Sequence, residues 1–198
     1  DFSSVGEFSM ASIAESSPSA LKQMLADFID KYDAWVVKSK QSVEAESQDL
    51  EVLGRLLSKA EHISYRMKKG LEYLTRDNSE KTALAFSIAN QAMFEQQRNG
   101  KRYRNWKNDG KAPFQLDEIQ EPKSGSYGNW RPFQLAFLLT QIPGIVDPSD
   151  DSRDEVDLIY FPTGGGKTEA YLGVAAFSII YERLSKPDEE LGVNVLMR

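Results

Sequence analysis

The chain has 198 residues, of which 40% are hydrophobic and 27% are charged. This balance is typical of a folded globular protein and excludes an intrinsically disordered one. The net charge of −6 argues against a nucleic-acid binder that is basic over its whole surface, although it leaves room for a local basic patch. There is no cysteine and a single histidine, His62, so disulfides and metal sites built on cysteines or histidine clusters are excluded.

No apolar stretch is long enough to span a bilayer. The longest, 135–146 and 171–181, run for about a dozen residues, whereas a membrane helix needs about 20. The first residues also lack the charged and then apolar pattern of a secretion signal. We therefore expect a cytoplasmic protein without a membrane partner.

The first part of the chain is predicted to be helical. Residues 1–17 are rich in serine and small side chains, which predicts a linker or a frayed end, and Ser17-Pro18 is typical of a helix start. Residues 18–98 then predict three amphipathic helices in an antiparallel bundle or long hairpin, with an oligomeric coiled coil as the alternative. The apolar positions are Leu21, Met24, Leu25, Phe28, Ile29, Tyr32, Trp35 and Val36 in the first helix; Leu50, Leu53, Leu57, Ala60, Met67, Leu71 and Leu74 in the second; and Leu84, Ile88, Ala92 and Met93 in the third.

A basic and aromatic segment, predicted to be a loop over 99–129, follows the helices. Its cations alternate with Tyr103 and Trp106, a mixture that can track a phosphate backbone while stacking on bases. The alternative is a solvated loop whose aromatic rings fold onto the core. If the segment binds nucleic acid, the cations that we expect to make the contacts are Arg102, Arg104 and Lys107.

The segment 157–168 reads Asp-Leu-Ile-Tyr-Phe-Pro-Thr-Gly-Gly-Gly-Lys-Thr. Leu158–Phe161 is a short apolar run that predicts a buried parallel strand, and Pro162 ends it. A helix is predicted from Glu169 to Leu184. A glycine-rich loop between a strand and a helix is the context in which phosphates are bound, and an accidental glycine turn is the alternative.

Each residue of this loop has an expected role. The glycines let the backbone turn its N–H groups toward a phosphate chain, Lys167 reaches the β- and γ-phosphates and offsets developing charge, and the Thr168 hydroxyl ligates Mg²⁺. Phe161 stands where the full Walker A pattern has glycine. The nucleotide contacts are therefore predicted at Pro162, Thr163, Gly164, Gly165, Gly166, Lys167 and Thr168.

A second element, Trp130-Arg-Pro-Phe-Gln-Leu-Ala-Phe137, lies upstream of the loop. Its Arg131 and Gln134 resemble the Arg-x-aromatic-Gln element of superfamily 2 helicases. A glutamine amide can both donate to and accept from an adenine edge, so this element favours ATP over GTP. The alternative is an ordinary helix start with a buried apolar face.

Together these elements predict an α/β fold, in which residues 130–198 begin a RecA-like P-loop helicase lobe with a second strand at 193–197. Such a lobe needs at least five parallel strands, and only two are predicted. Neither Asp154-Glu155 nor Asp188-Glu-Glu190 follows an apolar strand, as a Walker B acid would. We therefore expect an N-terminal piece of a larger ATPase that is inactive alone, because its acidic motif and second lobe lie elsewhere.

Five segments of the chain are similar to the DrmA family, the helicase-like proteins of bacterial DISARM anti-phage systems. They are Phe86–Met93, Arg131–Leu139, Ile142–Pro148, Phe161–Gly173 and Val193–Arg198. In that family Phe is normal at the first loop position. The resemblance implies a superfamily 2 ATPase that uses ATP and Mg²⁺, acts on DNA, and works with a DrmB-like partner and a DNA methyltransferase.

Two other functions share part of this evidence. An ATP-gated DNA-binding or scaffold subunit that does not separate strands would carry the same motifs. A P-loop kinase or a signalling ATPase would carry the glycine loop, but Arg131, Gln134 and the Pro-Thr-Gly-Gly-Gly-Lys-Thr form of the loop disfavour it.

Overall fold

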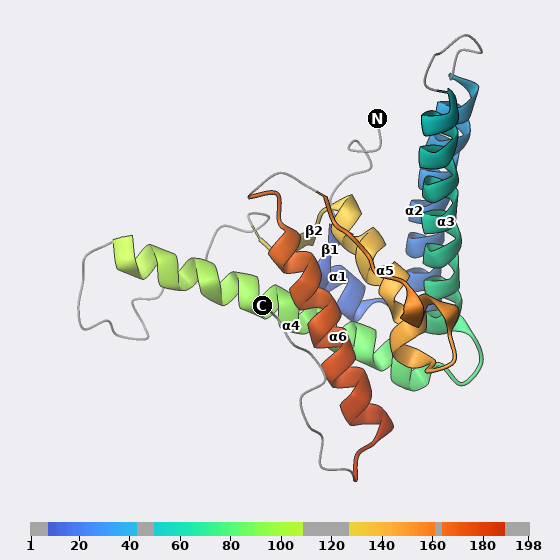
Figure 1. Cartoon of the computed structure of the whole chain (residues 1–198). Helices are drawn as coiled ribbons and strands as arrows, with labels where there is room; N and C mark the ends of the chain where they lie inside the picture. Colours follow the sequence, from blue (N-terminus) through green and yellow to red (C-terminus); the bar gives the residue numbers. More distant parts are fainter. Residues whose placement is uncertain (1–7, 43–49, 109–126, 161–163, 189–198) are drawn as a thin grey trace.

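The computed structural model describes residues 8–42, 50–108, 127–160 and 164–188, and the side chains of 101–108 fall outside that description. The described residues are mainly helical (Figure 1). Their only strands, β1 (Phe8–Ser9) and β2 (Asn129–Trp130), form a small antiparallel sheet in which Phe8 lies opposite Trp130.

Helices α2 (Pro18–Gln41) and α3 (Leu50–Thr75) form a long hairpin, one of the two predicted arrangements (Figure 1). The predicted start of α2 is confirmed, because the Ser17 hydroxyl accepts a hydrogen bond from the Ala20 amide at 3.3 Å. Ser64, which interrupts the apolar pattern of α3, is buried and donates its hydroxyl to Asp33. The interruption is therefore a polar contact between the two helices.

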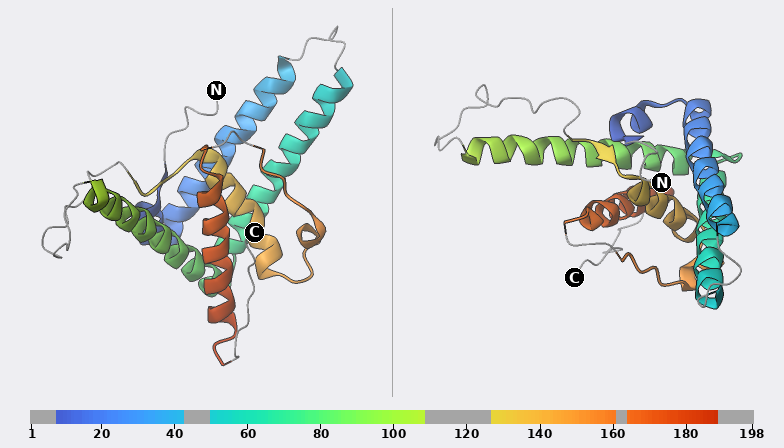
Figure 2. Two further views of the ribbon diagram at one scale, coloured as in Figure 1. Left: turned by 60° about the vertical axis from the view of Figure 1, so that its left-hand side comes forward. Right: turned by 90° about the horizontal axis from the view of Figure 1, so that it is seen from above.

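Helix α4 (Glu80–Asn108) leaves the hairpin and packs against α1 (Met10–Glu15) and α6 (Lys167–Ser185) (Figure 2). The apolar face predicted for this helix was wrong in part, since Leu84 is 48% exposed and Ile88 is 39% exposed. The contacts with α1 and α6 select a different face. The side chains on that buried face are Thr82, Ala85, Phe86, Ala89, Asn90 and Met93.

The amino-terminal segment also differs from the predicted linker. Residues 8–15 form β1 and α1, and the side chains of Met10 and Ile13 are almost completely buried. The Ser9 hydroxyl caps α1 by accepting from the Ser12 amide at 3.2 Å. Strand β1 pairs with β2, which is far along the chain, so the local composition did not predict that residues 8 and 9 form a strand. Helix α4 likewise continues to Asn108, into the segment that was predicted to be a loop.

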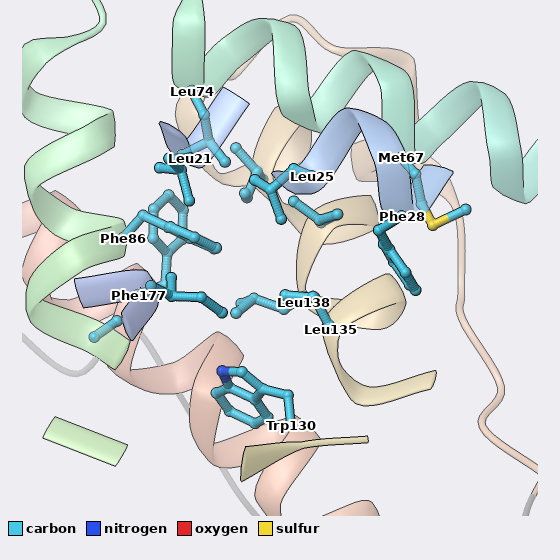
Figure 3. Packing of buried hydrophobic residues seen from close by; sticks show 14 of the residues in the cluster. Leu21, Leu25, Phe28, Met67, Leu74, Phe86, Trp130, Leu135, Leu138 and Phe177 are labelled. Atoms are coloured by element: carbon cyan, nitrogen blue, oxygen red, sulfur yellow. The ribbon is translucent and has the colours of Figure 1, made fainter. Parts of the chain in front are cut away.

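Helix α5 (Pro132–Val146) lies at the centre, between α3 and α6. One hydrophobic cluster joins its Leu135 and Leu138 to side chains of every other α-helix and to Trp130 (Figure 3). The core therefore unites residues on both sides of 99–129. Where α3 and α5 cross, Gly70 lies directly against the backbone of Leu139, so that a Cβ on Gly70 would be 2.1 Å from the Leu139 carbonyl oxygen.

The predicted α/β fold, with the start of a RecA-like lobe, is contradicted. Residues 155–160 contain no strand, and Val156, Leu158 and Tyr160 are 96%, 87% and 94% exposed. A strand is stable only when neighbouring strands satisfy its backbone, and among the described residues the only sheet is the pair β1 and β2. The second predicted strand, 193–197, lies outside the described residues.

Within the described ranges, no helix is both long and apolar enough to cross a lipid bilayer.

The contact at Gly70 makes a prediction about stability. We expect Gly70→Ala to lower the free energy of unfolding by about 2–3 kcal/mol, because backbone at an overpacked helix crossing must move apart. Gly54→Ala in the same helix is the matched control, since a Cβ there meets no heavy atom within 4 Å. It should instead add about 0.5–1 kcal/mol through helix propensity. Urea denaturation of both variants measures the difference, and equal stabilities would contradict the close crossing.

Candidate functional site

Trp130 holds the beginning of α5 in place. Its side chain is completely buried, and its indole N–H donates to the Asn90 side-chain oxygen at 2.7 Å. Asn90 in turn donates to the Phe86 carbonyl at 2.8 Å. The other side of the ring lies on α6, where a Cβ on Gly173 would be 2.7 Å from the indole (Figure 3). The end of β2 is thus fixed between α4 and α6, directly before Arg131.

Gln134 organises the first turn of α5. Its side-chain oxygen accepts from the Arg131 amide at 2.7 Å, as the third helical residue does in a capping box. Pro132 occupies the first helical position, where the missing N–H is not needed. Gln134 is 3% exposed, so its amide is held by packing as well as by this bond.

The same two side chains reach the glycine loop. The Gln134 amide nitrogen donates to the Gly166 carbonyl at 2.7 Å, and the Arg131 guanidinium donates to the Gly165 carbonyl at 2.9 Å. The structure therefore brings together the two elements that the sequence singled out. The contact of Gln134 with an adenine stays a prediction. In this structure the side chain bonds the helix start and the loop.

The loop leads into α6 with two left-handed residues. Gly164 and Gly166 have φ angles of 79° and 88°, which side chains with a Cβ rarely adopt. Gly166 is the N-cap of α6, and no side chain caps this helix. Because the first amides of a helix have no partner within it, the start of α6 can receive an anion. Lys167 is half-buried and Thr168 is exposed in this first turn.

Other predicted site residues are not placed here. Pro162 and Thr163 lie outside the described residues. Arg102, Arg104 and Lys107 fall within α4, but their side chains are outside the description, so their nucleic-acid contacts stay a prediction. Among the described residues, no group of three or more histidine, aspartate or glutamate side chains is arranged to hold a metal ion.

Sequence reasoning missed a polar stripe on α3, formed by His62, Arg66, Lys69 and Tyr73. These residues recur at helical spacing and face the acidic connection 147–157, which leads from α5 toward the glycine loop. The helical spacing of these polar residues was the one signal in the sequence, and it did not indicate their acidic partners, which lie far along the chain. The stripe ties the connection to the hairpin.

Arg66 makes the strongest of these contacts. Its side chain is 6% exposed, and its two terminal nitrogens lie 2.6 and 2.8 Å from the two carboxylate oxygens of Asp157. It also donates to the Thr140 carbonyl at 3.2 Å and lies 3.1 Å from Glu155. A bidentate pair of this kind fixes both partners in distance and orientation.

The pKa values follow from this pairing. The hydrogen bond to Asp157 raises the pKa of Arg66 above its usual range. Burial alone would raise the pKa of Asp157, but hydrogen bonds from Arg66 and Gln141 outweigh it and leave that pKa lowered. Both groups are therefore charged at neutral pH. The Gln141 amide, which lies about two helical turns after Gln134 on α5, donates to Asp157 at 2.6 Å.

Asp150 and Asp147 are held by the other end of the stripe. Lys69 lies 2.7 Å from Asp150, and the Tyr73 hydroxyl donates to Asp147 at 2.9 Å. Burial would raise the pKa of Asp150, but hydrogen bonds from Lys69 and from the amide and hydroxyl of Ser152 lower it to about 2.

The site thus consists of a glycine loop with two left-handed residues, leading into a helix whose first turn no side chain caps. Comparison with known proteins adds a relative. The chain is 33% identical to the DISARM protein DrmA of Bacillus paralicheniformis over 199 aligned positions, which cover 98% of the chain. The chain spans only 17% of the length of that protein. It is therefore related in sequence to a DISARM protein along nearly all of its own length. No protein-family model matches the chain.

The loop geometry predicts different outcomes for two glycines. Gly164→Ala should lower stability by about 1–2 kcal/mol, because a Cβ disfavours the left-handed region although the surrounding space is open. Gly166→Ala should lower the stability by about 1–3 kcal/mol more than Gly164→Ala does, since the new Cβ would also lie 2.6 Å from the Gln134 amide nitrogen.

Chemical denaturation of both variants, alone and with Gln134→Ala, measures this difference. Gln134→Ala should remove the additional stability loss of Gly166→Ala and leave the stability loss of Gly164→Ala unchanged. An excess that persists in the Gly166→Ala/Gln134→Ala protein would contradict the contact between the two residues.

The lowered pKa of Asp150 predicts how stability depends on pH. An aspartate whose pKa is lower in the folded than in the unfolded chain stabilises the fold above about pH 4, and this contribution is lost as the pH falls toward 2. Asp150→Asn should therefore lower stability by about 1–2 kcal/mol at pH 7, and the difference from wild type should shrink below pH 4. The exposed neighbour Asp151 provides the control substitution, Asp151→Asn. A pH-independent difference would rule out ionisation as the cause.

Proposed function

We infer that the loop 164–168 binds the phosphate groups of ATP. The observation that carries this inference is the pair of contacts from Arg131 and Gln134 to the carbonyls of Gly165 and Gly166. These contacts turn two loop carbonyls toward α5. The first turn of α6, which no side chain caps, lies directly after these carbonyls, and a helix start of this kind can receive an anion.

The residues after the glycines supply charge and a metal ligand. Lys167, in the first turn of α6, neutralises charge on the terminal phosphates. Thr168 is exposed beside it, and a hydroxyl oxygen suits Mg²⁺, which takes oxygen ligands and keeps several waters. Bound Mg²⁺ would supply further neutralisation of the phosphate oxygens.

The hydrogen bonds of Gln134 bear on the choice between adenine and guanine. Its amide nitrogen donates one hydrogen bond to Gly166, and its amide oxygen accepts one from Arg131. An amide nitrogen has two hydrogens and an amide oxygen has two lone pairs, so one donor and one acceptor are left for a base edge. Arg131 is exposed next to it, at the mouth of the loop. This arrangement is the support for ATP as the nucleotide.

For the whole protein we extend the inference to a superfamily 2 helicase or translocase that acts on DNA in DISARM anti-phage defence. The sequence relationship to DrmA supports this role, and a DrmB-like partner subunit follows from it. The acidic motif needed for hydrolysis would come from another part of such a protein.

Substitution of Lys167 tests nucleotide binding in the full-length protein. We expect Lys167→Ala to weaken ATP binding by about tenfold or more and to abolish hydrolysis, because the charge on the terminal phosphates loses its partner. Lys186→Ala is the matched control at the other end of α6, where the lysine pairs with Glu182 at 2.9 Å. Equilibrium binding and phosphate release measure both variants, and hydrolysis near the wild-type rate in Lys167→Ala would refute the assignment.

A further inference from the structure

Helix α5 holds both ends of the segment that carries the glycine loop. Near its start, Arg131 and Gln134 bond the carbonyls of Gly165 and Gly166. Near its other end, Gln141 donates to Asp157 at 2.6 Å, and the Thr140 carbonyl accepts from Arg66. Positions 134 and 141 are about 10 Å apart along a helix axis, since each residue rises 1.5 Å. One rigid element therefore sets the separation of the two anchor points.

Two described side chains between these anchors contribute little packing. Leu158 is 87% exposed and Tyr160 is 94% exposed. Asp157 is thus the last described residue before the loop that is held by several hydrogen bonds. The Asp157 side chain is 28% exposed and the Arg66 side chain is 6% exposed, so Arg66 is the more firmly packed partner of the pair.

Arg66 connects this segment to the helical hairpin. It contacts the connection through Asp157 and Glu155, and it contacts α5 through the Thr140 carbonyl. A buried guanidinium is strongly unfavourable unless carboxylates compensate it, and here its Nε atom makes no hydrogen bond. The two acidic groups are therefore needed at their present positions as long as Arg66 stays buried.

We propose that Arg66 is a positioning residue for nucleotide binding, because its bidentate contact with Asp157, together with the hydrogen bond from Gln141, holds the chain that leads toward the glycine loop beside α3 and α5. This role rests on the proposed function of the loop. A loop that is held near its binding geometry loses less conformational freedom when a phosphate binds, and so binds more tightly. Without the Arg66 side chain, Asp157 keeps only the hydrogen bond from Gln141, and Glu155 keeps only the exposed contact with His62, so the chain that leads toward the loop is less constrained.

The experiment uses the full-length protein with Arg66→Met, Asp157→Asn and the double substitution. Methionine keeps an apolar stem without a buried charge, and asparagine keeps the volume of Asp157. We expect each single substitution to weaken ATP binding by about three- to tenfold, as couplings between contacting groups do. The double variant should bind ATP no less tightly than the single variant with the lower affinity, because both changes break the same contact. Lys40→Met is the control, since Lys40 pairs with Glu61 on the exposed hairpin.

Hydrogen exchange of the nucleotide-free protein gives a second readout that global destabilisation does not mimic. Amides of 164–168 should exchange faster in Arg66→Met, while amides of α4 keep their wild-type rates. Arg66→Lys, which keeps the charge without the bidentate geometry, should recover part of the affinity. ATP binding within about 1.5-fold of wild type in both single variants, or unchanged exchange at 164–168, would overturn the role of Arg66. Failure of the wild-type protein to bind ATP would instead overturn the proposed function.

Discussion

The candidate site depends on one buried amide. Gln134 accepts from the Arg131 backbone and donates to the Gly166 carbonyl, so a single side chain joins the first turn of α5 to the residue that caps α6. The amide can do this only because Trp130, fixed by Asn90 and packed on Gly173, places the start of α5 within reach of α6. Loss of the tryptophan packing would therefore disturb the loop without touching any residue in it.

A second set of contacts controls the approach to the loop. The apolar side of α3 packs in the core, and its polar stripe holds an acidic connection by charge and hydrogen bonds. The buried cation Arg66 and the half-exposed Asp157 are worth little as a source of net stability, because desolvation offsets most of their attraction. Their value lies in geometry, since a bidentate pair has one preferred orientation. The hairpin is therefore joined to the loop region by a contact that specifies position more than it adds free energy.

Local patterns predicted part of this structure well. The start of α2 at Ser17-Pro18 was predicted from a helix cap, which is a strong local signal. Arg131 and Gln134 were singled out by their motif, but their hydrogen bonds to the loop carbonyls were not predicted. The buried face of α4 was mispredicted because its partners α1 and α6 come from distant parts of the chain. The strand expected at 158–161 failed for a related reason. An apolar run shows that a segment can be buried, but pairing needs neighbours that the run itself does not encode. The polar stripe on α3 was missed because its acidic partners lie 91 residues away in the case of Arg66 and Asp157.

The exposed side chains of Val156, Leu158 and Tyr160 have a consequence for handling the protein. The segment contains no strand and presents alternating apolar side chains, and a chain of this kind is a template on which another chain can add by backbone pairing. Aromatic and branched side chains strengthen such associations. Concentrated preparations of these 198 residues therefore present a surface on which copies can associate.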